Sequence, residues 1–311
     1  MSEQHEIIVV GGGIAGLSAG LAAARLGRRT LVLTGDTLGG QLLNIERIDG
    51  YPGFPEGVAG YDLCPITQEQ ATEAGAEIVM TSLTALERSD DLWHVTTANE
   101  SYSARCVILA TGTELREIGI PGETALRGKG VSHCASCDAP LLSDRPAVVA
   151  GGGDSALQEA LTLAEHCSAV TIVHWGERFA GQASYRALVE SNSKISSLRN
   201  SEITEILGDE AVEGVRIKNT TSDEASELEC AGVFIFVGLQ ANTAFIEDDS
   251  LLDVKRAIVT DAAMCTHWEG LLAAGTVRSN NAGRAAAAAG DGATAALTAH
   301  RFLQTERWPA V

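Results

Sequence analysis

The sequence predicts an α/β fold made of two Rossmann-like dinucleotide-binding domains, the second inserted into the first. Two segments, one beginning near Glu6 and one at Pro146, each run from an apolar strand through a Gly-rich turn and an apolar-periodic helix to a second strand. This succession is the βαβ unit of dinucleotide-binding proteins. Because the two copies lie far apart in the chain, they indicate two domains and not a short-period repeat.

The first βαβ unit joins a strand over residues 7–10 to a strand over residues 30–34 through the turn GGGIAG, residues 11–16. In such a GxGxxG turn the first Gly allows a tight bend, the second lets the backbone approach a pyrophosphate, and the third lets the helix pack on the strand. The N-terminus of the helix then presents free N–H groups to the anion. The acidic residue that usually ends the second strand and binds a ribose is displaced to Asp36, just beyond the strand. A solvated turn residue is the other interpretation of Asp36.

The second unit carries GGGDSA, residues 151–156, in which Ala takes the place of the third Gly, an accepted variation. Its second strand runs into HWGER, residues 174–178. A site for the 2′-phosphate of NADPH needs a cluster of arginines here, because guanidinium groups form bidentate bonds with phosphate. Trp175 and Gly176 stand there instead, Arg178 is the only cation nearby, and Glu177 would repel a phosphate. NADPH is therefore disfavoured.

Other patterned stretches complete the two domains. Apolar runs that end in Gly-containing turns predict closing strands, and alternating stretches predict antiparallel additions. The closing strands are expected in residues 105–112, 231–243 and 270–277, and the antiparallel additions in residues 92–97 and 212–219. The C-terminal stretch predicts a helix from about Gly283, with Gly290 and Gly292 as helix flaws or points of close packing. The predicted domains are residues 1–115 with 240–311, and residues 116–239.

The chain is acidic, with 22 Lys and Arg residues against 41 Asp and Glu residues and a formal charge of −19. This charge argues against nucleic acid or an anionic membrane as a partner. No apolar run approaches the length of a membrane span, and we expect no signal peptide because the chain runs almost directly into its first motif. Most of the seven cysteines are isolated in the sequence, as expected of small buried side chains in a reducing cytoplasm. A cytoplasmic location is expected.

Cys134 and Cys137 form a Cys-x-x-Cys motif, followed at once by Asp138. Zinc normally needs four ligands and the chain offers no second cysteine pair, while a purely structural disulfide is unusual in the cytoplasm. A redox dithiol is the favoured interpretation, since such motifs often lie at a helix N-terminus that stabilises a thiolate. Asp138 is then suited to carry the proton that the dithiol exchanges. A helix N-cap is the other role open to it.

Seven motifs, read in order along nearly the whole chain, resemble those of low-molecular-weight bacterial thioredoxin reductases. They are GGGIAGLSAG, GGQLLNIERIDGYPGF, ATGTE, CASCD, GGGDSA, VGLQANT and GLLAAG. The resemblance implies a homodimeric flavoprotein whose FAD-binding domain is split by a pyridine-nucleotide domain that carries the redox dithiol and rotates. It also implies that Cys137 faces the flavin, that Cys134 exchanges with a protein disulfide, and that Asp138 transfers the proton.

The resemblance also implies the residues that hold the cofactors. For FAD they are Gly11, Gly13, Ile14, Ala15, Gly16, Thr34, Gly35, Asp36, Gly40, Gln41, Asn44, Thr111, Gly112, Gly275, Thr276, Arg284 and Ala285. Apart from the resemblance, the candidates for holding a dinucleotide in the second domain, either NADH or a second flavin, are Gly151, Gly153, Asp154, Ser155 and Trp175. The indole of Trp175 could stack on a flat ring.

The chain departs from the family pattern at three places. The three arginines that bind the 2′-phosphate of NADPH in the family are replaced by Trp175, Gly176 and Ala180. The Asp of an Ala-Gly-Asp motif that helps to bind FAD is replaced by Thr276. An Arg-Gln-Ala that begins the last helix is replaced by residues 283–285, Gly-Arg-Ala. We expect FAD binding to survive, because Thr276 keeps a hydroxyl donor, and NADPH oxidation to be lost.

The sequence therefore predicts an FAD-dependent disulfide oxidoreductase that reduces a thioredoxin-like protein or another disulfide through Cys134 and Cys137. Its electrons are expected from NADH, from a ferredoxin-type protein or from a second flavin. The first alternative is a dithiol oxidase that runs in reverse, from a small-molecule dithiol through FAD to oxygen. The second is a non-enzymatic flavin-binding sensor, which the intact CxxCD motif disfavours.

Overall fold

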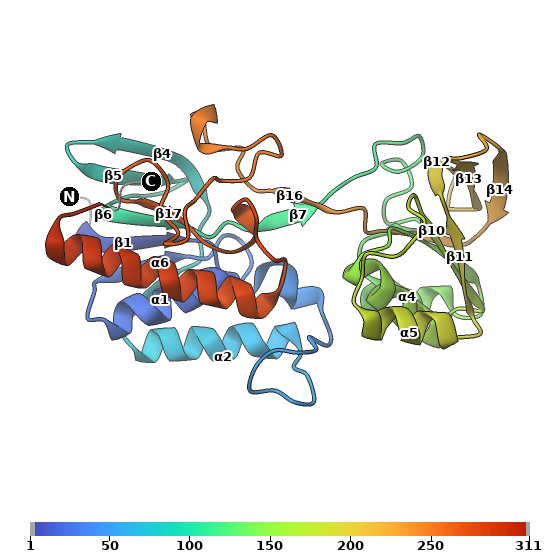
Figure 1. Cartoon of the computed structure of the whole chain (residues 1–311), viewed down its shortest axis with the longest axis horizontal. Coiled ribbons are helices and arrows are strands. Elements are labelled where there is room, and N and C mark those ends of the chain that lie inside the picture. The colour runs from blue at the N-terminus through green and yellow to red at the C-terminus, as the bar shows by residue number, and fades with distance from the viewer. Residues whose placement is uncertain (1–3, 309–311) are drawn as a thin grey trace. The chain divides into compact units, whose positions relative to one another are not determined.

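The computed structural model describes residues 4–308 and is drawn in Figure 1. The described chain divides into two compact units. Unit 1 is formed by the residues up to Glu114 together with those from Gln240 on, and unit 2 is Leu115–Leu239. The outermost residues of the predicted first domain, 1–3 and 309–311, lie outside the described part of the chain.

Unit 1 contains a seven-stranded sheet in the order β3-β2-β1-β6-β5-β4, with β17 paired to β6. Strands β3, β2, β1, β6 and β17 run parallel, and β5 and β4 are antiparallel additions. The strands are β1 Gln4–Val10, β2 Thr30–Leu33, β3 Glu77–Val79, β4 Leu83–Ser89, β5 Leu92–Thr97, β6 Ser101–Leu109 and β17 Leu271–Ala273. The α-helices are α1 Ile14–Arg25, α2 Gly60–Glu73 and α6 Ala285–Thr305, and the short 3-10 helices are η1 Gly40–Asn44, η3 Asp249–Leu251 and η4 Gly275–Val277.

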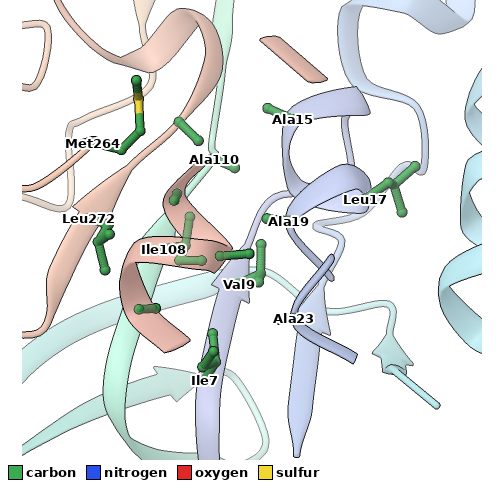
Figure 2. Packing of buried hydrophobic residues seen from close by; sticks show 14 of the residues in the cluster. Ile7, Val9, Ala15, Leu17, Ala19, Ala23, Ile108, Ala110, Met264 and Leu272 are labelled. Carbon is green, nitrogen blue, oxygen red and sulfur yellow. The ribbon is translucent and has the colours of Figure 1, made fainter. Parts of the chain in front are cut away.

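Helices α1, α2 and α6 cover one face of this sheet (Figure 1). Alternate residues of the central strands, among them Ile7, Val9 and Ile108, point to that face and are fully buried. Figure 2 shows these side chains in one apolar cluster with Ala15 and Ala19 of α1. The small Ala side chains let α1 lie close to the sheet. Helix α1 begins shortly after β1, at the carboxyl end of this central strand. In α/β sheets, ligands bind at the carboxyl ends of the strands.

The long helix α6 packs against α1 at a glycine. A Cβ at Gly292 would lie 2.0 Å from the carbonyl oxygen of Ala15 and 3.0 Å from the backbone N of Ala19. A Cβ at Gly290 would meet nothing within 4 Å, and Gly290 is exposed. Gly292 is therefore a point of close packing between α6 and α1. Gly290 is a flaw in the helix, the other role expected for these glycines.

Opposite effects are expected from adding one methyl group at these two positions. Gly292→Ala should lower the free energy of unfolding by about 1–3 kcal/mol, because the methyl group forces α6 away from α1. Gly290→Ala is the matched control and should raise it by roughly 0.5–1 kcal/mol, since Ala favours a helix over Gly. Urea unfolding followed by circular dichroism measures both. Equal effects of the two substitutions would contradict this packing.

Unit 2 contains a parallel five-stranded sheet in the order β11-β10-β9-β15-β8 and an antiparallel three-stranded sheet β12-β13-β14. Its strands are β8 Val131–Ser132, β9 Pro146–Ala150, β10 Ala169–His174, β11 Ile195–Arg199, β12 Ser201–Leu207, β13 Gly214–Asn219, β14 Ala225–Glu229 and β15 Gly232–Ile235. Its helices are α3 Ala135–Asp138, α4 Asp154–His166, α5 Ala183–Ser191 and the 3-10 helix η2 Ala139–Leu142. Where the chain passes between the units, β7 Thr113–Leu115 pairs with β16 Leu239–Ala241.

The fold class predicted from the sequence is confirmed, and both βαβ units form as expected, as β1-α1-β2 and β9-α4-β10. The predicted antiparallel additions are also confirmed, as β5 and β13. The expected closing strand over residues 231–243 is divided into β15 and β16, because Gly238 adopts a positive φ of 123° between them. None of the helices in residues 4–308 combines the length and the apolar character needed to cross a bilayer.

Candidate active site

The Gly-rich turn of unit 1 has the backbone geometry of a phosphate-binding turn. Gly11 adopts φ 125°, and a Cβ there would lie 2.1 Å from the carbonyl oxygen of Ala110. A Cβ at Gly16 would lie 1.9 Å from the carbonyl oxygen of Gly11, so the helix can approach the strand only without a side chain. Beside Gly13, by contrast, there is open space, and Gly13 as the N-cap residue has no side chain that could cap the helix. An anionic group therefore has room at the first turn of α1, whose N–H groups lack partners within the helix.

The loop after β2 lies against this turn. The backbone N of Gly39 donates a 2.9 Å hydrogen bond to the carbonyl oxygen of Gly12, and a Cβ at Gly40 would lie 3.6 Å from the Cα of Gly13. The strand before the loop, β2, ends at Leu33, and Thr34 directly after it is buried. Asp36 is exposed, and its Oδ1 accepts a 3.0 Å hydrogen bond from Ser82.

Two further segments predicted to hold FAD meet at the same place. The side-chain amide of Gln41 donates to the carbonyl oxygen of Thr113 at 3.0 Å, and the hydroxyl of Thr113 lies 3.2 Å from that of Thr276. A Cβ at Gly275 would lie 2.7 Å from the Cβ of Ala15 in α1. The structure thus brings residues 11–16, 39–41, 111–113 and 275–276 together at the start of α1. The cradle fits a dinucleotide, while the role of each residue stays a prediction.

Three other predicted residues lie at the ends of helices. Asn44 is the last residue of η1, Arg284 is the exposed residue before α6, and Ala285 is its first residue. Their part in cofactor binding also stays a prediction.

A buried ion pair beside Thr276 was not foreseen from the sequence. Asp291 of α6 forms two hydrogen bonds with the guanidinium of Arg278, at 2.7 and 3.0 Å. It also accepts bonds from the backbone N of Gly275 at 3.2 Å and from the side chain of Asn281 at 2.9 Å. The Asp291 carboxylate therefore holds the turn of η4. In the sequence, Asp291 could have been singled out because it is an acidic residue between two glycines in the Ala-rich stretch of the predicted C-terminal helix.

The Gly-rich turn of unit 2 repeats the geometry of the first. Gly151 adopts φ 133°, and a Cβ at Gly153 would meet nothing within 4 Å. The following loop folds onto this turn, since the carboxylate of Asp154 accepts a 2.6 Å hydrogen bond from the backbone N of Gln182. Ser155 of α4 is exposed. The turn keeps open space for a ligand at Gly153, in agreement with a dinucleotide site.

The end of β10, where arginines bind a 2′-phosphate in the family, carries no cation at the three replaced positions. Trp175 is 73% exposed and Ala180 is also exposed. The ring of His174 is buried, and its Nε2 lies 3.0 Å from the carbonyl oxygen of Arg178. A Cβ at Gly176 would lie only 2.8 Å from the same Nε2. An arginine at position 176 would therefore require the buried imidazole to move.

Cys134 and Cys137 are joined by a disulfide at the start of α3. Cys134 is the N-cap, and its Sγ accepts a 3.3 Å hydrogen bond from the backbone N of Cys137. The hydroxyl of Ser136 lies 3.6 Å from the same sulfur. Cys137 is exposed and Cys134 is partly buried. Asp138 ends α3, and at the N-cap position of η2 its side chain makes no capping bond, so the structure does not show the alternative role expected of it.

The other five cysteines are buried, as predicted from the sequence, and they are poor nucleophiles. Cys64, Cys106, Cys167, Cys230 and Cys265 are all buried free thiols. Burial raises the pKa of Cys64 to about 11 and that of Cys230 to about 12. Thiolates are therefore scarce at these positions near neutral pH, and the disulfide pair carries the reactive sulfur of the described chain.

Two Gly-rich βαβ units and a dithiol define the class of pyridine nucleotide-disulphide oxidoreductases, whose family model matches residues 5–292. Thioredoxin reductases from Treponema pallidum and Mycolicibacterium smegmatis are each 37% identical, over 98% and 96% of this chain and 99% and 96% of their own. The solved Lactococcus lactis thioredoxin reductase superposes with a TM-score of 0.94 at 33% identity, covering 96% of this chain and 99% of its own. The chain belongs to the low-molecular-weight thioredoxin reductase family. It is a flavin-dependent disulfide oxidoreductase.

Proposed function

We propose that this protein reduces the disulfide of a thioredoxin-like protein through Cys134 and Cys137, and that NADPH is not its electron donor. The names of its relatives support the class of substrate. The observation that carries the choice of donor is that Trp175, Gly176 and Ala180 carry no charge, while the exposed Arg178 between them adjoins the exposed Glu177. A 2′-phosphate there would lose its charge-assisted bonds, which are among the strongest in proteins.

FAD is proposed to lie on unit 1, at the open space beside Gly13 and against the loops that meet there. When bound, FAD would supply the electron transfer that links the donor to the Cys134–Cys137 pair. The chain's own part is to offer N–H groups of α1 to the pyrophosphate and to keep Gln41, Thr113 and Thr276 in one hydrogen-bonded arrangement.

The dithiol is proposed to act in two exchange steps. The Cys134 thiolate attacks the substrate disulfide, which forms a mixed disulfide and releases one substrate thiolate. Cys137 then attacks the sulfur of Cys134, which closes the internal disulfide and releases the second substrate thiolate. The two released thiolates take up the protons that the two cysteines give up, with Asp138 as the proposed carrier. The hydrogen-bond donors at Cys134, from Cys137 N–H and Ser136, favour its thiolate form.

The donor is proposed to be NADH, a ferredoxin-type protein or a second flavin on the turn of unit 2. The open space at Gly153 and the exposed indole of Trp175 suit a dinucleotide without a 2′-phosphate. Anaerobic mixing of the purified flavoprotein with NADH, with reduced ferredoxin and with a small dithiol identifies the donor. Reduction by the dithiol, with reoxidation by air, would instead indicate the reverse reaction of a dithiol oxidase. Release and counting of flavin distinguishes one site per chain from two.

The family's homodimer is proposed for this chain as well. Light scattering of the purified protein is expected to give twice the mass of one chain, 32.4 kDa. A mass of a single chain at micromolar concentration would contradict it.

A further inference from the structure

We propose that Glu159 is a positioning residue that sets the redox balance of the Cys134–Cys137 pair. Glu159 lies on α4, and its Oε2 accepts a 2.7 Å hydrogen bond from the backbone N of Ala135. Ala135 directly follows Cys134 and is fully buried. A carboxylate is thereby fixed one peptide unit from the first cysteine. The inference rests on the proposed function, in which this pair is the redox centre.

The packing of the two helices holds the carboxylate in place. Buried alanines of α3 and α4, Ala135 among them, belong to one apolar cluster, and Glu159 is partly buried at its margin. A hydrogen bond from an N–H to a carboxylate is charge-assisted and stronger than one between neutral groups. This bond fixes the first residue of α3, and with it the turn that brings the N–H of Cys137 to the sulfur of Cys134.

Charged side chains of both signs, Arg127, Glu117 and Glu123, act on His133, the residue before Cys134. Burial, followed by the repulsion of Arg127, lowers the pKa of His133, so this neighbour of Cys134 is neutral at pH 7. Of the elements packed on α3, η2 has no ionisable side chain and α4 carries Asp154, Glu159, Glu165 and His166. Asp154 is bonded to Gln182, and residues 165–166 lie at the far end of α4. The carboxylate of Glu159 is the charge that a hydrogen bond fixes at the residue after Cys134.

A nearby negative charge disfavours a thiolate, whereas it affects a neutral disulfide little. In a glutathione buffer, two molecules of reduced glutathione reduce the protein disulfide to the dithiol and form one molecule of glutathione disulfide. The reaction is reversible and reaches an equilibrium. Glu159 is therefore expected to favour the disulfide side of this equilibrium. Removing the charge of Glu159 should stabilise the reduced pair. The Cys134–Cys137 disulfide should then be a stronger oxidant, because a disulfide becomes more oxidising when its reduced form is stabilised.

The test is Glu159→Gln in the holoenzyme, with Glu165→Gln, an exposed carboxylate on the same helix, as the matched control. Gln keeps an acceptor for the N–H of Ala135 and removes the negative charge. Proteins are equilibrated in glutathione buffers without donor, alkylated and analysed by mass spectrometry of the Cys134–Cys137 peptide. For E159Q we expect the equilibrium constant to shift about tenfold toward the dithiol, which corresponds to roughly 30 mV. E165Q should match the unmodified protein.

An unchanged equilibrium in folded E159Q, or a shift toward the disulfide, would overturn the proposal. If E159Q does not fold, Glu159→Asp is the second variant, because its side chain is one methylene shorter and holds the charge farther from the pair. It should give a smaller shift in the same direction. If Glu159→Asp gives no shift, the proposal is overturned as well. The readout is an equilibrium of the pair and not turnover. A failure of this inference is therefore distinct from a failure of the proposed function, which turnover of a cysteine variant tests.

Discussion

Replacing Cys134 with serine is expected to abolish reduction of a thioredoxin-like disulfide and to leave the absorption spectrum of the bound flavin nearly unchanged. Serine cannot form the mixed disulfide on which the exchange depends. Its hydroxyl can still accept the N–H of Cys137 at the N-cap of α3, so the helix should remain in place. Turnover with the identified donor, and the flavin spectrum of the same sample, measure the two effects.

Cys230 provides the matched control for this substitution. It lies in the same unit, it is buried, and burial raises its pKa to about 12, so it offers no thiolate for exchange. Cys230→Ala should therefore retain turnover. Turnover that persists in Cys134→Ser would show that the electrons reach the substrate by another route and would refute the assignment of the dithiol.

The second large effect is expected at Asp291. Asp291→Ala should lower the free energy of unfolding by about 3 kcal/mol, because it leaves the guanidinium of Arg278 unpaired in a site where that side chain is only 16% exposed. It also removes the acceptor for the backbone N of Gly275. We therefore expect weaker retention of FAD, measured as the flavin-to-protein ratio after gel filtration, besides the lower stability in urea.

The exposed ion pair of Arg256 and Asp249 is the control for Asp291. Both of its side chains are more than half exposed, at 54% and 84%, and such pairs contribute about 0.2–1 kcal/mol. Asp249→Ala should thus change stability little and leave the flavin content unchanged. If the two substitutions had equal effects, the account of Asp291 as the residue that holds η4 would be wrong.

The parts of the fold that the sequence predicts are those with a local pattern. The βαβ units combine a continuous apolar strand with glycines at fixed spacing, and each glycine has a steric requirement visible in the structure, such as the 1.9 Å approach at Gly16. The strands β5 and β13 alternate between buried and more exposed positions, so they too could be predicted. Helix α2 contains Pro65 and yet forms, because its buried face, including Leu63 and Ala71, packs in unit 1.

The contacts that shape the candidate site could be predicted only in part. The motifs identify which segments meet at the start of α1, but not the hydrogen bonds that join them. Asp291 bonds to Gly275, and Glu159 bonds to Ala135, across many intervening residues. No short-range pattern encodes such pairs, because they depend on how whole helices pack. The short strands β7, β8 and β16 likewise have too few residues for a periodicity to show.

We propose that this flavin-dependent disulfide oxidoreductase does not draw its electrons from NADPH, since Trp175, Gly176 and Ala180 offer the 2′-phosphate no cation. The most direct test is anaerobic rapid mixing of the purified flavoprotein with micromolar NADPH, monitored by the visible absorbance of the flavin. We predict that the flavin stays oxidised under these conditions, while one of the other donors bleaches it. Rapid bleaching by NADPH would contradict the account.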